Sequence, residues 1–279
     1  MGCLLIGKER SNQGMDLLFT FPFSRRDLFL SKWLLGATHI TAITLVNLIL
    51  IFIVHQMTFL QHYQPFSHFL TFFGFMFLSL HAVYALTLFI GTLTGGFTSQ
   101  AILTLITGLF PMGLYTLIRG AVGWHVIVFN GYRNLTHSFW NLDHYFIDLS
   151  VFNFWNYNFT YWQPSLIHEY EISSIYHTPS LLSYLVLAFY LIIFLRLGFS
   201  LYPLISAENN GKIIIFKKLE LLFLWCTTIS LGLLGGEIGA SVFSTYSNHL
   251  LYGFYIGFII ATIITYILLA KLLKKSFSV

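Results

Sequence analysis

The chain has 279 residues, of which 57% are hydrophobic and only 9% charged, with a mean hydropathy of +0.76 and a formal net charge of +4. A soluble domain carries about a quarter charged residues, so this chain cannot cover a globular surface with polar groups. The composition excludes an ordinary soluble domain and indicates a protein that is solvated by lipid.

Six apolar blocks follow one another along the chain, each long enough to cross a hydrocarbon core of about 30 Å as a helix. They are residues 28–55, 67–92, 98–118, 180–202, 219–239 and 250–271. The alternating apolar and polar residues of a membrane barrel strand do not occur. The sequence therefore predicts an all-α polytopic helical membrane protein with about six transmembrane helices, in which residues 1–279 form a single transmembrane domain.

The basic residues predict the orientation. Six crossings place both termini on one side, and the segments of that side, with the helix ends that adjoin them, hold twelve of the 14 Lys and Arg residues; Arg119 and Arg133 lie on the other side. The positive-inside rule then places both termini, including residues 1–27, in the cytoplasm. Because the basic residues are spread over three segments and lack a recognition motif, no nucleic-acid partner is expected.

The predicted external segment, residues 119–179, is rich in Trp, Tyr and Phe and holds four acidic residues. Such rings are favoured at the lipid headgroup level. Two interpretations stay open: an interfacial cap over the helices, or a platform that contacts an amphipathic substrate as it leaves the membrane.

Motifs of catalysis and metal binding are incomplete. His168 and Glu169 begin like a zinc-protease helix, but no second His follows at the required spacing. The stretch from Ser206 to Lys212 ends in Gly-Lys without the rest of a phosphate-binding loop. We expect no catalytic residue, no metal and no cofactor, so that this chain is not an enzyme and any ATP hydrolysis occurs in a separate subunit.

Glu237 lies within the fifth apolar block, directly after Gly235 and Gly236 and shortly before Gly239. This pattern suggests a helix that breaks or turns near the outer face. We name Gly235, Gly236 and Glu237 as a candidate outer gate, with a purely structural role as the alternative.

The segment before the first block predicts a short amphipathic helix over residues 11–20, ended by Pro22. Met15, Leu18 and Phe19 are spaced at i, i+3 and i+4, so they share one helix face. That face would fit a groove of a partner protein, and the alternative is that the helix lies at the lipid interface.

The first block begins with its own capping pattern. Ser24 is followed three residues later by Asp27, as in a capping box. Arg25 and Arg26 occupy the first turn, where the helix dipole disfavours cations, so we expect anionic lipid or an acidic partner surface to compensate.

The N-terminal segment as a whole resembles the cytoplasmic coupling segment of ABC-2-type exporter permeases, particularly the Gram-positive kind that works beside a separate ATPase. The matching residues are Glu9-Arg10, Gly14-Met15-Asp16-Leu17-Leu18, Pro22-Phe23-Ser24-Arg25-Arg26-Asp27, Ser31-Lys32-Trp33 and Gly36. Glu208, Gly211 and Phe216 similarly resemble the second cytoplasmic loop of these permeases. In the family the coupling segment follows earlier membrane helices, so the chain looks N-terminally short by about two spans.

The resemblance implies a permease subunit of an ATP-binding cassette exporter in a bacterial cell membrane. It implies a separate ABC ATPase subunit and a second permease subunit, in a homodimer or heterodimer, as partners. The implied ATPase-coupling residues are Glu9, Arg10, Met15, Asp16, Leu18, Phe19, Pro22, Ser24, Arg25 and Arg26. The alternatives are a polytopic membrane protein without a motor, such as a scaffold or immunity protein, and an intramembrane enzyme or secondary carrier.

Overall fold

The computed structural model describes residues 1–12, 14, 20, 22–63, 65–130, 151–152, 179–205, 212–243 and 250–276. Six of its helices are long and apolar enough to cross a membrane. They are α3 (Arg25–Met57), α5 (Phe66–Leu93), α6 (Phe97–Asn130), α8 (Leu181–Leu201), α9 (Lys217–Val242) and α10 (Leu250–Ser276). No strand occurs in the described part of the chain. The predicted all-α fold of a multi-pass membrane protein is confirmed.

Four short elements accompany the long helices. They are the π-helical turn η1 (Leu4–Lys8), α1 (Glu9–Ser11), α4 (Leu60–Tyr63) and the 3₁₀ turn η5 (Tyr202–Leu204). We call η1 and α1 together the N-terminal helix. It packs beside α5 and α6 rather than standing apart from them.

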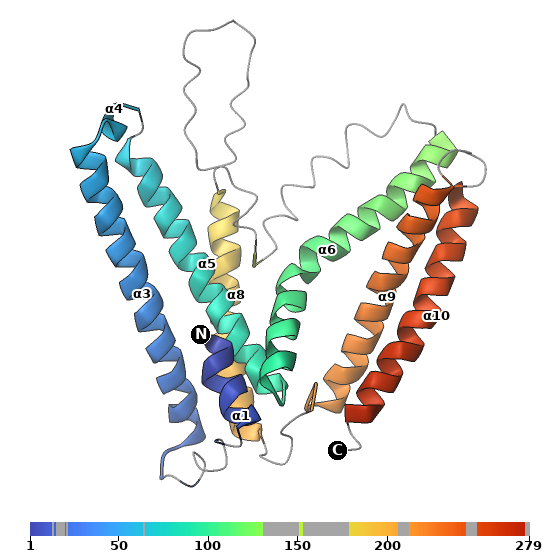
Figure 1. Ribbon diagram of the computed structural model, residues 1–279, viewed down its shortest axis with the longest axis horizontal. Helices are drawn as coiled ribbons and strands as arrows, with labels where there is room; N and C mark the ends of the chain where they lie inside the picture. The colour runs from blue at the N-terminus through green and yellow to red at the C-terminus, as the bar shows by residue number, and fades with distance from the viewer. Residues whose placement is uncertain are drawn as a thin grey trace, which may run out of the picture.

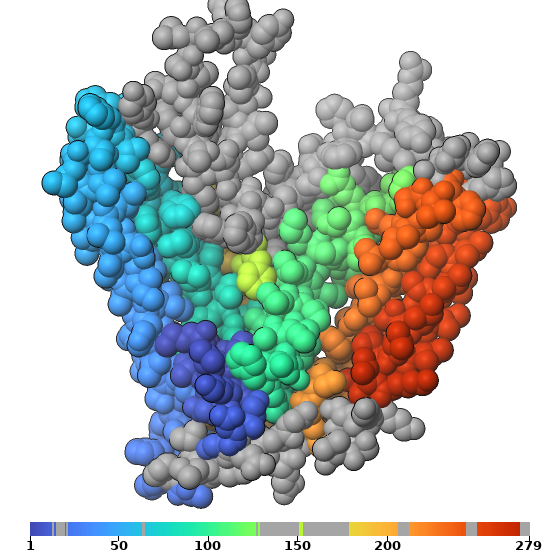
Figure 2. Space-filling view, viewed as in Figure 1, coloured from blue at the N-terminus to red at the C-terminus, as the bar shows by residue number. Residues whose placement is uncertain are grey.

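The long helices form two groups that are joined by α6 (Figure 1). In the first group α5 packs against α3 and α8, and in the second group α9 packs against α10. Near its start α6 contacts α5, and it also contacts α9 and α10. The two groups approach each other at the end where α1 lies and separate toward the other end (Figures 1 and 2).

α6 bends between its two ends (Figure 1) and carries Pro111 in its interior. A proline inside a helix removes one backbone hydrogen bond and its ring clashes with the preceding turn, which is a common cause of kinks. The bend directs the far end of α6 away from α5 and toward α9 and α10.

α5 is the central helix of the first group. Its side chains Phe75, Leu86 and Leu88 have no exposed surface. By contrast, α3 and α10 carry rows of exposed aliphatic side chains such as Ile43 at 61% and Ile259 at 54%. Helices that are apolar all round suit this arrangement, because lipid solvates whichever faces protein does not cover.

α6 extends beyond the predicted end of the third block at residue 118. Residues 119–130, which we predicted to begin the external segment, are helical. The stretch after Arg119 remains apolar and contains no proline, so nothing in it ends the helix. Residues 131–150 and 153–178, which carry most of the predicted aromatic segment, lie outside the described residues.

The predicted break in the fifth block is wrong, because α9 is continuous through Gly235, Gly236 and Glu237. These glycines serve close packing against α10 instead. A Cβ at Gly235 would lie 2.9 Å from the carbonyl oxygen of Gly257, and one at Gly253 would lie 2.6 Å from that of Gly239. Only glycine allows the two backbones to approach this closely, as in G-x-x-x-G pairs of membrane helices.

Candidate coupling site

The N-terminal helix is built into the first helix group. Ile6 has no exposed surface and packs in one apolar cluster with Phe29 of α3 and Leu88 of α5. Glycine allows close approach at two points: a Cβ at Gly2 would lie 2.9 Å from the Cβ of Thr87, and one at Gly7 would lie 2.8 Å from the Cα of Phe97. The segment that carries the family resemblance thus begins as a packed part of the bundle.

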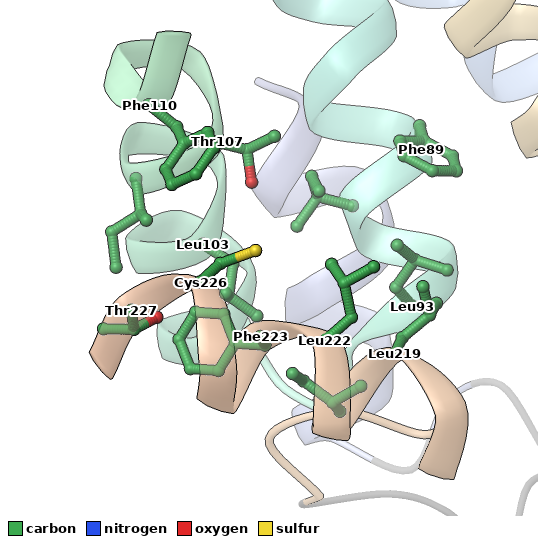
Figure 3. A pocket seen from close by; sticks show the side chains of 13 residues that line it. Phe89, Leu93, Leu103, Thr107, Phe110, Leu219, Leu222, Phe223, Cys226 and Thr227 are labelled. Atoms are coloured by element: carbon green, nitrogen blue, oxygen red, sulfur yellow. The ribbon is translucent and has the colours of Figure 1, made fainter. Parts of the chain in front are cut away.

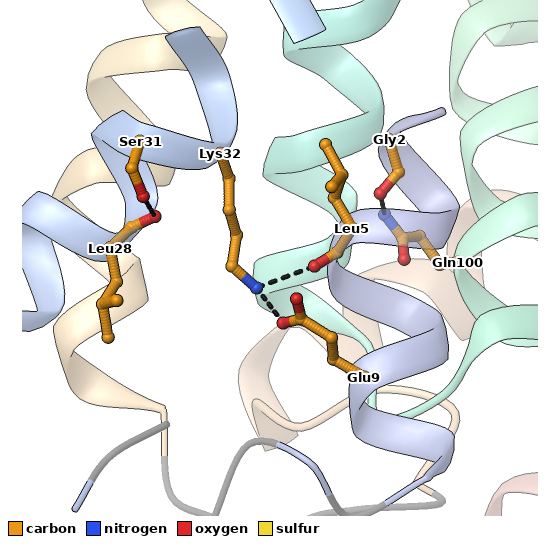
Figure 4. Close-up of polar contacts among 7 residues, drawn as sticks. All are labelled: Gly2, Leu5, Glu9, Leu28, Ser31, Lys32 and Gln100. Atoms are coloured by element: carbon orange, nitrogen blue, oxygen red, sulfur yellow. Dashed lines mark hydrogen bonds and ion pairs between the residues drawn. The ribbon is translucent and has the colours of Figure 1, made fainter. Parts of the chain in front are cut away.

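Lys32 of α3 holds the N-terminal helix by two contacts (Figure 4). Its Nζ donates a hydrogen bond to the carbonyl oxygen of Leu5 at 2.7 Å and forms an ion pair with the carboxylate of Glu9. The Lys32 side chain is only 8% exposed, and that of Glu9 is 31% exposed. Tyr84 of α5 donates to the Lys32 carbonyl oxygen at 2.6 Å, so the same residue also links α3 to α5.

Arg10 is turned into the protein, with 1% of its surface exposed. Its Nη1 donates to the carbonyl oxygen of Thr94, which follows the last residue of α5. A cation is favourable at a helix C-terminus, where backbone carbonyls lack helical partners. Burial lowers the pKa of Arg10 to about 10, so the guanidinium is still a cation at neutral pH.

Gln100 and Ser11 connect the N-terminal helix to the start of α6. The Nε2 of Gln100 donates to the carbonyl oxygen of Thr87 at 2.8 Å and to that of Gly2 at 3.3 Å. The Oγ of Ser11 accepts a hydrogen bond from the backbone N–H of Phe97 at 3.1 Å. With Lys32 and Thr94, these contacts attach one short helix to α3, α5 and α6 together.

Ser24 is the N-cap of α3, as the sequence predicts. Its Oγ accepts from the backbone N–H of Asp27 at 3.1 Å and donates to the Asp27 carboxylate at 2.6 Å. Serine and a carboxylate at these positions satisfy a backbone donor at the helix start and place negative charge where the dipole favours it.

Contacts within the chain offset the unfavourable position of Arg25 and Arg26 in the first turn of α3. The Nη1 of Arg25 donates to the carbonyl oxygens of Pro203 at 2.9 Å and Ile205 at 2.8 Å, at the end of α8 and η5. The guanidinium of Arg26 lies 5.5 Å from the ring centre of Phe199. Both side chains are nevertheless exposed, so they can also face a partner. The carbonyl oxygens at the end of η5 supply part of the compensation for Arg25, and a contact with anionic lipid or an acidic partner surface stays a prediction.

Several predicted coupling residues lie outside the described residues, namely Met15, Asp16, Leu18 and Phe19 in the first segment and Glu208 and Gly211 in the second. Pro22 is described and exposed. Phe216 is the N-cap residue of α9 and packs against the core around α5.

The backbone near Phe216 ties the two helix groups together. The N–H of Ile215 donates to the carbonyl oxygen of Leu93 at 2.9 Å, and the N–H of Gly95 donates to that of Lys212 at 2.8 Å. The start of α9 is thereby attached to the end of α5.

Glu237 faces α6, where a Cβ at Gly120 would collide with its carboxyl group. Its Oε1 is buried without a hydrogen-bond partner in the described part of the chain. Five residues further along α6, the Nε2 of His125 lies 2.8 Å from the hydroxyl of Tyr255 on α10. Glu237 is thus a contact between α6 and α9, and its role in an outer gate stays a prediction.

Sequence reasoning missed Thr94 and Gln100. Thr94 lies in the short turn between two long apolar blocks and acts through its backbone carbonyl oxygen, so its side chain gave no signal, whereas Gln100 is a polar residue near the start of the third block. A buried glutamine or a capped carbonyl is recognised only when its partner is known, and the contacts to the N-terminal segment, Arg10 to Thr94 and Gln100 to Gly2, join residues that are 84 and 98 positions apart.

Comparison with known proteins places the site in a matched region. Residues 1–112 match the family model described as ABC-2 family transporter protein. The chain is 26% identical over 251 residues to the probable ABC transporter permease YtrC of Bacillus subtilis strain 168, in an alignment that covers 89% of this chain and 69% of that protein. No solved structure matches. The N-terminal helix, Lys32, Thr94 and Gln100 all lie within the family match.

Proposed function

We propose that this relative of the ABC-2 transporter permeases is the membrane-spanning subunit of an exporter that is driven by a separate ABC ATPase. The family match, the relative and the six apolar helices support a membrane permease of an ABC transporter. The observation that carries the finer proposal is the attachment of the N-terminal helix to α3, α5 and α6 within the matched segment.

The attachment suits a segment that transmits movement. Docking of the ATPase to residues 11–20 would exert force on the segment that follows the N-terminal helix. Because that helix is attached to α3, α5 and α6, the force would be transmitted to these three spanning helices. Breaking one buried ion pair or leaving one buried donor unpaired is costly, so the N-terminal helix and the first group move as one body. The two packed helix groups meet at one end, through α6 and through the attachment of α9 to α5, so they can then change their relative angle as a switch between two arrangements.

In this proposal the chain forms the translocation path with a second permease subunit and has no chemistry of its own. ATP binding and hydrolysis belong to the partner, because both Gly-Lys pairs of the chain lack the Ser or Thr that ends a phosphate-binding loop: Glu9 follows Gly7-Lys8, and Ile213 follows Gly211-Lys212. Both termini face the cytoplasm, in agreement with the distribution of Lys and Arg.

The coupling is tested by truncating the apolar face of the segment that we expect to dock. The ATPase used in the assay is an ABC ATPase with a complete phosphate-binding loop, sought first in the reading frames next to the gene for this chain. The double variant Leu18→Ala/Phe19→Ala should still insert, but co-purification of the ATPase should fall by roughly tenfold or more, since truncating central anchors costs on the order of 1–4 kcal/mol.

Ile43→Ala, a truncation on the 61% exposed face of α3, is the matched control and should leave co-purification unchanged. Unaltered co-purification and export in a well-expressed double variant would contradict the coupling proposal and favour a membrane protein without a motor.

Orientation is tested separately with single cysteines in a chain whose Cys3 and Cys226 are replaced by Ser. Cysteines at Ser138 and Ser174 should react with a membrane-impermeant thiol reagent in intact cells, and one at Asn210 should not. Labelling at Asn210 alone would reverse the proposed topology.

A further inference from the structure

An apolar cavity of about 260 Å³ lies where the two helix groups meet (Figure 3). Its walls come from three helices: Phe89 and Leu93 of α5, Leu103 and Phe110 of α6, and Leu222 and Phe223 of α9. The few polar side chains at the wall, such as Thr107 and Cys226, are small and uncharged. We call it the α5–α6–α9 cavity.

The dimensions and lining of this cavity suit an alkyl chain. An apolar cavity of roughly 150 Å³ stays dry and accommodates benzene, so a space of this size holds a longer hydrocarbon. All three walls belong to candidate membrane spans, so the surrounding medium of the cavity is lipid. A ligand with hydrogen-bonding groups inside the cavity would find almost no partners there, which excludes polar solutes.

Positive charge lies at one end of the cavity. Leu219 and Leu222 line it, and Lys217 and Lys218 directly precede them in the first turn of α9, with both lysines exposed. Cations are unfavourable at a helix N-terminus, and Glu220 is the acidic residue in the first turn of α9. An anion beside the two exposed lysines would add to the stabilisation that Glu220 gives. Anionic lipid headgroups attract lysines that lie close to the membrane surface.

We propose that the α5–α6–α9 cavity holds one acyl chain of an anionic phospholipid, whose headgroup lies at Lys217 and Lys218 in the leaflet that those lysines face. The chain would fill the space between the end of α5, the start of α6 and the start of α9, where the first and second helix groups are joined. Occupancy would therefore favour one relative position of the two groups. This site requires no ATPase and stands independently of the proposed transport function.

Photo-crosslinking tests the acyl chain. The full chain is placed in phosphatidylcholine nanodiscs that contain a small proportion of phosphatidylglycerol with a diazirine on one acyl chain. After illumination, peptides that contain residues 103–110 and 219–227 should carry the lipid adduct.

Thr107→Trp fills the cavity from α6, and adducts in both peptides should fall by about tenfold. Leu109→Trp, on the 50% exposed outer face of the same helix, is the matched control and should change them little. Cys226→Phe fills the cavity from the opposite wall and should repeat the loss, so that a folding defect in one variant does not decide the outcome. Folding of each variant is checked by size-exclusion chromatography.

The headgroup is tested by comparing this probe with a phosphatidylcholine probe that carries the same diazirine chain. The wild-type chain should prefer phosphatidylglycerol, and Lys217→Gln/Lys218→Gln should remove that preference. Lys271→Gln, an exposed lysine of α10, should retain it. Equal capture of the two probes by the wild-type chain would overturn the anionic headgroup.

Two results would overturn the site itself. Adducts spread evenly over α3 and α10 and insensitive to Thr107→Trp would show ordinary surrounding lipid. A Cys226 to Cys226 disulfide between two copies, formed in the membrane with loss of the adducts, would show that a second copy covers the cavity instead.

Discussion

The N-terminal helix and the α9–α10 pair are held in place by opposite means. The N-terminal helix is attached by buried polar contacts to Lys32, Thr94 and Gln100, whereas α9 and α10 are joined by glycines that bring two backbones together. In lipid there is no hydrophobic driving force that would bring two apolar helices together, so their association depends on close packing or on polar contacts. Polar contacts fix one register and one direction, while glycine contacts maximise the touching surface. Buried polar contacts suit a segment that transmits force from a docked partner, and close glycine packing suits two helices that move as one rigid unit.

The largest effect should come from breaking the buried ion pair of the N-terminal helix. Glu9→Ala leaves Lys32, which is 8% exposed, without its carboxylate. We expect a loss of about 3 kcal/mol in unfolding free energy, at the lower end of the usual range because Glu9 is partly exposed. The loss is measured as the difference in unfolding free energy between the variant and the wild-type chain in detergent. The double change Glu9→Ala/Lys32→Met should recover part of the loss, and failure to do so would show that the pair does not stabilise this region.

Gly257→Leu tests the second mode of attachment. The new side chain would meet the backbone of α9 at Gly235, so the pair must separate, at a cost of about 1–3 kcal/mol. The matched control is Gly113→Leu on α6, where nothing lies within 4 Å of the added Cβ. The control should be neutral or slightly stabilising, because leucine is the better helix former. Equal effects of the two substitutions in the same unfolding assay would refute close glycine packing.

Ser24→Ala should have a smaller and more local effect. Removing the N-cap hydroxyl costs about 1 kcal/mol and exposes the first amides of α3. Hydrogen exchange of residues 25–28 should become faster, while exchange in the N-terminal helix should not change. Ser24→Asp, which keeps an acceptor at the cap, should restore slow exchange. If it does not, the Ser24 hydroxyl is not acting as a cap.

The smallest effect is expected at Arg26. Its contact with the ring of Phe199 is exposed, so Arg26→Ala should cost about 0.5–1 kcal/mol in the same unfolding assay. Arg26→Lys keeps the charge and should retain part of the contact. A loss larger than that of Ser24→Ala would show that Arg26 has a further partner.

The sequence predicts the six helices well because long apolar blocks have few other structures available in lipid. Block ends are predicted less well: α6 continues to Asn130 because nothing in the residues after Arg119 stops a helix. Ser24 is predictable because a cap lies within three residues of its partner, whereas Arg10 and Gln100 act on groups far away along the chain. The glycines of α9 were wrongly interpreted as a helix break, because glycine occurs both where helices break and where two helices pack closely. The same spacing, Gly235 to Gly239 and Gly253 to Gly257 on consecutive blocks, would have indicated helix pairing if both blocks had been compared.

The length of α6 makes the shape of this protein depend on the thickness of its bilayer. Thirty-four helical residues extend about 50 Å, well beyond a hydrocarbon core of about 30 Å. A helix that is longer than the core adapts by tilting or bending, and a thinner membrane demands a larger angle. Because the far part of α6 contacts α9 and α10 while its start is fastened to α5, a change of tilt displaces one helix group sideways relative to the other. The length of the lipid acyl chains, which sets the bilayer thickness, thus influences the relative position of the two helix groups.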